Sequence, residues 1–379
     1  MSRFLRKLIF FLVCLLFLQA SYLPYLDNYQ LENVVKDLLQ TKESAVRERD
    51  LERFLSVIDS NNPFYVQEQK RWFVDAIKVI EPASYRLELL RIDQKQKNQL
   101  HIMVRQSYQQ NGKRYVVQFP LLIRKTQAGW RESDLAFKQL KSDPIQVFYT
   151  IPALEESAYI ALDIVKRALR VMKERNHWIT KRVEVKLYHD PEVFRQSVKP
   201  SLPFWAGGWH EARQSIKMVV THQQPKWLAS GLIHELAHQM VSELTNDNAA
   251  YWLQEGAAMY YEAHLLPGLH EDLPSEEDQP AKYSLSELKK MNLEKLPDKE
   301  AAQYYWSCYR LFRFLVEEYG EEKIRSVFAV LKKYPYLDQD TIEKKEVINQ
   351  RTEEAIRKGL AITEKQLEQK WRKKRGESY

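Results

Sequence analysis

One segment of the 379-residue sequence combines two histidines and a glutamate at a spacing that suits metal chemistry. Residues 233–241 read Ile-His-Glu-Leu-Ala-His-Gln-Met-Val. On a helix, His234 and His238 are one turn apart and project from the same face, which suits two ligands of a tetrahedral zinc ion. Glu235 lies beside that face, where its carboxylate can reach a water molecule without being a ligand itself. An apolar stripe would anchor this helix in a core, and it consists of Ile233, Leu236, Ala237, Met240, Val241 and Leu244.

A catalytic zinc site also needs a third protein ligand, and it keeps a fourth position for water. Glu255, seventeen positions after His238, is placed to supply that ligand from the next helix. A chance pentapeptide on an amphipathic helix is the alternative interpretation. The downstream glutamate favours the metal site over that alternative.

Two segments resemble the gluzincin metallopeptidases, the peptidase-MA-like group that includes thermolysin and the aminopeptidase-N family. They read HELAHQ at 234–239 and WLQEGAAMYYE at 252–262. The resemblance implies that His234, His238 and Glu255 bind Zn²⁺ and that Glu235 is the general base. The spacing between the segments is two residues shorter than is usual in aminopeptidase N, and Met259 stands where thermolysin has an aspartate. The resemblance therefore does not name the residue that orients the imidazoles.

A third segment, AAQYYWSCYRLFRFLVEEYG at 301–320, resembles the Tyr-x-x-Ser helix that crosses the active site in this group. The resemblance implies that Tyr304, three residues before Ser307, donates a hydrogen bond to the transition-state oxyanion. Tyr305 is the competing residue. A purely structural role is the alternative for either tyrosine, because Tyr305 belongs to an apolar helical stripe. The whole resemblance covers about residues 150–372, including closing helices at 353–371.

The residues ahead of the zinc motif suggest where a substrate would lie. Members of this group place an edge strand there, to which a peptide adds itself as a further strand, and 216–220 is predicted to be this strand. Residues 207–211 read Gly-Gly-Trp-His-Glu and do not match the box that binds a free amine in aminopeptidases. Glu211 therefore does not support aminopeptidase activity, and a glycine turn is the better interpretation.

The first 26 residues have the pattern of an export signal. Arg3, Arg6 and Lys7 precede an apolar run that extends from Leu8 to Leu18. An uncleaved membrane anchor is the second possibility, because residues 22–26 could extend the run, and a buried helix of a cytosolic protein is the third. In the first two cases the basic flank places the rest of the chain outside the cytoplasm.

The body of the chain divides into two predicted domains of an α+β protein. Residues 27–145 form an accessory domain, and residues 146–379 form a mainly helical peptidase domain with a small sheet. The accessory domain resembles, in element order, the cone-shaped fold of the nuclear-transport-factor type. Its helices are predicted at 31–58 and 72–80, and its strands at 85–92, 100–108, 115–123 and 130–137, with a hairpin turn at Asn111-Gly112.

Charge and cysteine content exclude several other classes. The formal charge of +7 comes from 58 basic and 51 acidic residues, and no nucleic-acid motif accompanies it, so we expect no nucleic-acid partner. On an exterior surface this charge would favour contact with anionic lipid or cell-wall polymer. Two cysteines, Cys14 and Cys308, provide neither a disulfide scaffold nor a cysteine-based zinc site.

The sequence thus predicts an exported zinc metallopeptidase that acts on peptide or protein substrates. A noncatalytic exported binding module with structural zinc is the alternative. A fourth protein ligand would distinguish them, because the enzyme hypothesis fails if His210, His222 or His264 completes the coordination sphere. The sequence does not choose between endopeptidase and aminopeptidase action, and it leaves open the substrate, signal cleavage, the role of the N-terminal domain and the oligomeric state.

Overall fold

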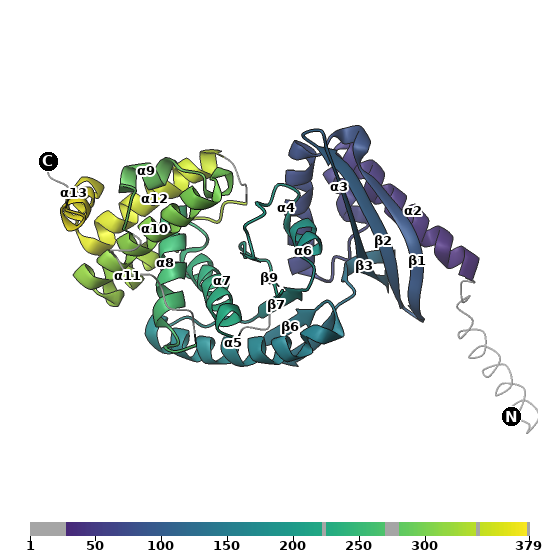
Figure 1. Ribbon diagram of the computed structural model, residues 1–379, viewed down its shortest axis with the longest axis horizontal. Helices are drawn as coiled ribbons and strands as arrows, with labels where there is room; N and C mark the ends of the chain where they lie inside the picture. Colours follow the sequence, from purple (N-terminus) through teal and green to yellow (C-terminus); the bar gives the residue numbers. More distant parts are fainter. Residues whose placement is uncertain (1–27, 222–224, 270–279, 339–341, 377–379) are drawn as a thin grey trace, which may run out of the picture. The chain divides into compact units, whose positions relative to one another are not determined.

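The computed structural model describes residues 28–221, 225–269, 280–338 and 342–376 (Figure 1). The predicted export segment lies outside these residues. Within them, no helix combines the length and apolar character needed to cross a membrane. Helices and two β-sheets confirm the predicted mixed α+β class.

The chain forms two packing units. The first contains residues 80–136 and the described residues before 61, and the second contains 61–79 and the described residues from 137 onward. Two elements ahead of the predicted boundary at 145 therefore pack with the second unit. They are helix α4 (Pro63–Val79) and strand β5 (Lys138–Ser142).

The first unit joins two helices to an antiparallel meander. Asn111 and Gly112 connect the second and third strands with positive φ angles of 53° and 73°, which confirms the predicted hairpin turn. The elements of this unit are α2 (Asn28–Glu48), α3 (Leu51–Ser56), the 3-10 turn η1 (Pro82–Ser84), β1 (Arg86–Gln96), β2 (Gln99–Gln110), β3 (Lys113–Thr126) and β4 (Gly129–Leu135).

The second unit is built on a five-stranded sheet with the order β5-β6-β7-β9-β8. Its parallel centre consists of β6 (Ile145–Tyr149), β7 (Val183–Tyr188) and β9 (Ile216–Val219), and the antiparallel β8 (Gly208–Trp209) forms one edge. The prediction that 216–220 is the edge strand is wrong, because β8 pairs with it and takes the outer position.

Helices make up most of the rest of this unit. Helix α8 packs against both α7 and α10. The elements are η2 (Pro152–Leu154), α5 (Glu155–Asn176), α6 (Pro191–Val198), α7 (Pro225–Thr245), α8 (Tyr251–His264), α9 (Leu285–Lys290), η3 (Leu293–Lys295), α10 (Asp298–Tyr319), α11 (Glu321–Leu331), α12 (Ile342–Leu360) and α13 (Glu364–Lys374).

Strand β7 shows how the sheet is covered on both faces, since all six of its residues are buried. Successive side chains of a strand point to opposite faces. Val183, Val185 and Leu187 enter the apolar core that also contains residues of α5 and α7. On the other face, Lys186 meets α4, and the ring of Tyr188 packs edge-on against an aromatic ring of α6.

A buried ionic cluster joins α4 to this second face. The carboxylate of Glu68 lies 2.8 Å from Lys186 Nζ on β7 and 3.4 Å from Lys217 Nζ on β9, and all three side chains are at most 2% exposed. Ser215 donates to the same carboxylate from its hydroxyl and backbone N–H. Burial alone would raise the pKa of Glu68, but the two lysines outweigh burial and hold the pKa well below its usual range.

The cluster predicts an acid-sensitive contribution to stability. Glu68→Gln should lower the free energy of unfolding at neutral pH by about 3–5 kcal/mol, because it removes the charge between two buried ammonium groups. The folded state binds the Glu68 proton more weakly than the unfolded state does. The contribution is therefore complete above the unfolded pKa of about 4.3 and is lost as the pH falls through the folded pKa.

Urea unfolding at pH 7 and at pH 4 and below would measure this difference. The exposed Glu174→Gln on α5 is the control, with little expected change at either pH. Equal stability of Glu68→Gln and the unmodified protein at pH 7 would contradict the prediction.

Candidate active site

The histidine motif lies in the middle of α7, and Glu255 lies in the first half of α8. The motif is anchored as predicted, because Ile233, Leu236 and Ala237 are fully buried. Gly256, next to Glu255, allows α8 to approach α10 closely. A Cβ atom there would lie 2.5 Å from the backbone oxygen of Cys308, far inside van der Waals contact.

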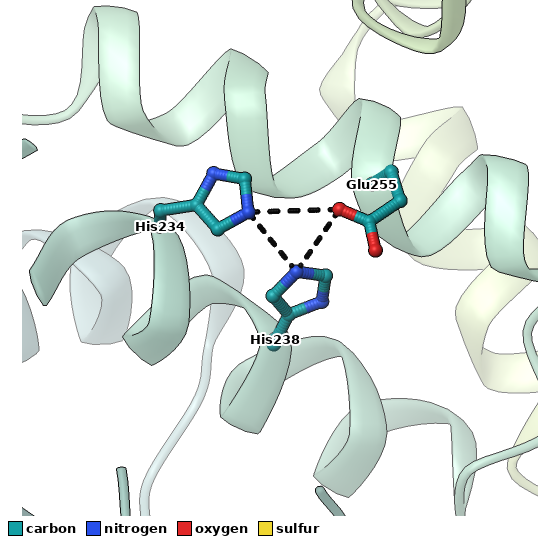
Figure 2. A group of neighbouring side chains, drawn as sticks. All are labelled: His234, His238 and Glu255. Carbon is teal, nitrogen blue, oxygen red and sulfur yellow. Dashed lines mark hydrogen bonds and ion pairs between the residues drawn. The ribbon is translucent and has the colours of Figure 1, made fainter. Parts of the chain in front are cut away.

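Three potential ligand atoms from these helices converge (Figure 2). His234 Nε2 and His238 Nε2 are 3.2 Å apart, and Glu255 Oε2 lies 3.6 Å and 3.3 Å from them, respectively. Tetrahedral Zn²⁺ with ligand bonds of 2.0–2.1 Å requires ligand atoms about 3.3 Å apart. The triangle therefore has the size of one face of a zinc coordination tetrahedron.

Two further features show that these residues fit a metal ion. Glu255 Oε2 is buried and has no hydrogen-bond partner among the described residues, so its lone pairs are available. Two imidazoles and a carboxylate are also a typical donor set for catalytic zinc. Burial opposes ionisation of Glu255, but His238 and His234 outweigh it and lower its pKa to about 2. Glu255 therefore stays a carboxylate, as a ligand must.

Glu262 orients one of the imidazoles. Its Oε2 lies 3.0 Å from His234 Nδ1. Because a carboxylate only accepts hydrogen bonds, Nδ1 carries the proton and the lone pair of Nε2 is left for a metal. The sequence motif included Glu262 without assigning it a role. The available signal was its position two helical turns after Glu255, which places both carboxylates on one face of α8.

Glu235 is buried beside the three potential ligands and is not part of their triangle. Burial raises the pKa of its carboxyl group, as do the neighbouring Glu255 and Glu262, while His234 and His238 lower it. Its Oε1 would lie 2.5 Å from a Cβ atom placed on Gly208. The backbone of the edge strand β8 therefore passes directly beside this carboxylate.

The other histidines do not join the cluster within the described part of the chain. There, His234, His238 and Glu255 form the only group of three or more such residues whose ligand atoms all lie within 4.8 Å of one another. Burial and the nearby His238 lower the pKa of His210 to about 3, so this imidazole stays neutral. His264 Nδ1 lies 2.8 Å from the carbonyl oxygen of Tyr260, and His222 lies outside the described residues.

The two candidate tyrosines on α10 have different surroundings. The Tyr305 ring lies edge-on to the His234 imidazole, with centroids 6.0 Å apart, and edge-on to Trp205. The Tyr304 side chain is 1% exposed and interacts with Cys308 in the core. Tyr305 therefore faces the ligand cluster, whereas Tyr304 is part of the helix packing.

Comparison with family models adds an independent observation. Residues 166–343 match a model described as the Peptidase MA superfamily. This match supports a zincin-like peptidase with metallopeptidase-like function. The matched segment contains all of α7, α8 and α10, and so every residue of the ligand cluster. Comparison with curated proteins gives no match.

The hydrogen bond from His234 predicts the effect of changing Glu262 on metal affinity. Glu262→Gln should weaken zinc binding by about 10–100-fold, because the neutral amide orients the imidazole less strongly and makes it a poorer donor. Competition with a chromogenic chelator measures the zinc Kd. Glu174→Gln is the control of equal charge change, and an unchanged Kd in Glu262→Gln would show that Glu262 does not support the ligand.

Proposed function

We propose that this protein is an exported zinc metallopeptidase of the gluzincin type, which hydrolyses peptide bonds with Glu235 as the general base. The observation that carries the proposal is the triangle of His234, His238 and Glu255 ligand atoms with the buried Glu235 beside it. A noncatalytic structural zinc site would have four protein ligands. The described residues provide three, which favours the enzyme over the binding module.

The proposed hydrolysis requires a Lewis acid and a general base, and different groups supply them. A zinc ion bound by the three ligands supplies Lewis-acid chemistry, because it acidifies water and polarises a carbonyl group. Glu235 takes the proton of the attacking water and returns it to the leaving amine. Its raised pKa suits the first step, because a carboxylate whose conjugate acid has a higher pKa is a stronger base.

Tyr305 is our preferred donor to the oxyanion. Its ring lies beside the His234 ligand, whereas Tyr304, the residue favoured by the family resemblance, lies in the core. A phenolic hydroxyl near the ligand cluster can donate a hydrogen bond to the oxygen that becomes negative in the transition state. The buried hydroxyl of Tyr304 interacts with Cys308 instead.

The substrate backbone is proposed to pair with β8. This strand is the sheet edge, and Gly208 lies in contact range of the Glu235 carboxylate. An extended peptide on this edge would carry a carbonyl group past the general base. The absence of a side chain at Gly208 leaves room for the Glu235 carboxylate itself beside this strand.

Export rests on the N-terminal sequence pattern. Basic residues ahead of the apolar run at 8–18 support placement of the catalytic part outside the cytoplasm, secreted or anchored at the outer face. In that location the net positive charge would favour contact with an anionic surface. Fractionation of cells that produce the full-length protein, with protease accessibility of residues after 27, tests this placement.

Removal of the general base tests the reaction. Glu235→Gln should retain stoichiometric zinc, because Glu235 is not a ligand, and should lose about 10²–10⁴-fold in kcat on a peptide library. Chelation should abolish the activity of the unmodified protein, and zinc should restore it. Full turnover by Glu235→Gln would rule out this mechanism, and absence of hydrolysis by the zinc-loaded protein would favour the binding module.

The two tyrosines provide a matched pair of variants. Tyr305→Phe should lower kcat by about 10²-fold with little change in KM, because the lost hydrogen bond forms in the transition state. Tyr304→Phe should mainly lower thermal stability, because its hydroxyl contacts the core. Kinetics and melting curves of both variants separate these effects, and the reverse pattern would assign the oxyanion donor to Tyr304.

A further inference from the structure

A cavity of about 900 Å³ in the second packing unit is lined in part by α7, the helix that carries His234 and His238. Its lining includes Ser242 and Glu243 of α7. Ser242 lies one helical turn, about 6 Å along the axis, after His238. It also includes Ala212 and Arg213, which follow the edge strand β8 in the chain. A peptide that pairs with β8 and continues past residue 211 would therefore reach this cavity.

Basic side chains outnumber acidic ones in the lining of the cavity. Arg213, Arg325, Lys332 and Lys333 all line it. The Arg325 guanidinium and the Lys332 ammonium group donate to backbone carbonyl oxygens. Arg213 lies over the ring of Tyr336, 3.8 Å from its centroid. Within the described part of the chain, none of the four cations forms a salt bridge with a carboxylate.

The two acidic residues of the lining, Asp247 and Glu243, interact with other groups of the protein. Asp247 Oδ2 lies 2.9 Å from Lys344 Nζ, so this carboxylate is paired. Glu243 accepts hydrogen bonds from the indole N–H of Trp178, the hydroxyl of Thr180 and the amide of Gln239. Asp247 is therefore neutralised by Lys344, whereas Glu243 keeps its charge because its three donors are neutral. The four cations of the lining still outnumber this one carboxylate.

The walls between the cations are apolar. Phe328 and Trp178 contribute buried rings, and the Ile179 side chain is 75% exposed beside them. A volume of this size lies in the upper part of the range that ligand pockets usually have, about 300–1,000 Å³. The cavity thus suits a carboxylate carried on an apolar or peptide framework rather than a small inorganic anion.

Glu211, between the edge strand and the cavity, is not available to hold a terminal amine. Its carboxylate lies 3.5 Å from Arg71 Nε and accepts hydrogen bonds from Trp209 Nε1 and Gln214 Nε2. Both of its oxygens therefore have donors from the protein itself. Glu211 would therefore not hold the N-terminal amine of a substrate, and a bound peptide chain could continue past this residue.

We propose that the cavity is an extended substrate subsite, which binds an acidic side chain of a peptide that is cut at an internal bond. The inference rests on the proposed peptidase function and adds the substrate class. Arg213 and Lys333 supply the charge-assisted contacts to the carboxylate. The apolar walls hold the residues that flank it.

A binding experiment tests the subsite separately from catalysis. The zinc-loaded full-length Glu235→Gln protein would be titrated with fluorescent peptides that are blocked at both ends and contain either two glutamates or two glutamines. We expect the glutamate peptide to bind about tenfold more tightly and the difference to shrink at high salt. A third peptide, with glutamines and a free terminal carboxylate, distinguishes an internal acidic residue from a C-terminus.

Charge-removing variants locate the binding. Arg213→Gln and Lys333→Gln, each in the Glu235→Gln background, should weaken binding of the glutamate peptide about tenfold and leave the glutamine peptide unchanged. Lys323→Gln, an exposed residue of α11 outside the cavity, is the matched control. Melting curves check the fold of Arg213→Gln, and the exposed Lys333 provides a second variant that does not depend on the contact with Tyr336.

Three outcomes would overturn the proposal. These are equal affinity for both blocked peptides, tight binding of only the peptide with a free C-terminus, and a glutamate preference that survives in both cavity variants. Hydrolysis is scored independently with the unmodified zinc-loaded protein. If no peptide is cut, the proposed function fails while the binding result still decides the nature of the cavity. If only peptides with a free amine are cut, internal cleavage fails and the peptidase function stands.

Discussion

The candidate site depends on the convergence of three lone-pair atoms from two helices at a buried position. His234 and His238 are brought together by helical spacing alone, but Glu255 must be supplied by α8 at 3.3 Å from His238. A carboxylate in such a position is costly unless a cation or proton compensates it. The packing of α8 between α7 and α10 imposes this arrangement, and Gly256 makes that packing possible because any side chain there would strike Cys308.

The sheet places a second constraint on the same site, because it fixes the position of the edge strand β8. Lys217 uses its ammonium group to contact Glu68 on α4 and its backbone to pair with Trp209 on the edge strand. The position of β8, and with it the approach of Gly208 to Glu235, is therefore tied to a buried ionic cluster on the opposite face of the sheet. Helix α4 precedes the meander in the chain, yet it is part of the scaffold that supports the edge strand beside the candidate site.

Much of the site could be predicted from the sequence because it depends on local periodicity. The four-residue spacing of His234 and His238 fixes their common face on any helix. Glu262 was missed because its partner is 28 residues away, and only the packing of α8 on α7 shows that the two side chains meet. The edge strand was misplaced for a similar reason, since β8 has only two residues and no periodic pattern. The positions of Tyr304 and Tyr305 differ by one residue on α10, about 100° around the helix, which sequence stripes do not resolve.

Charge is divided between the proposed site and the cavity next to it. Glu235, Glu255 and Glu262 carry three negative charges when ionised, so a dication would leave a net charge of −3 + 2 = −1. An acidic side chain is repelled from this place. Arg213 and Lys333 attract the same side chain into the cavity, whose lining on α7 begins one helical turn after His238. Repulsion at one position and attraction at the other would together fix the register of an acidic peptide, and specificity of this kind requires both contributions.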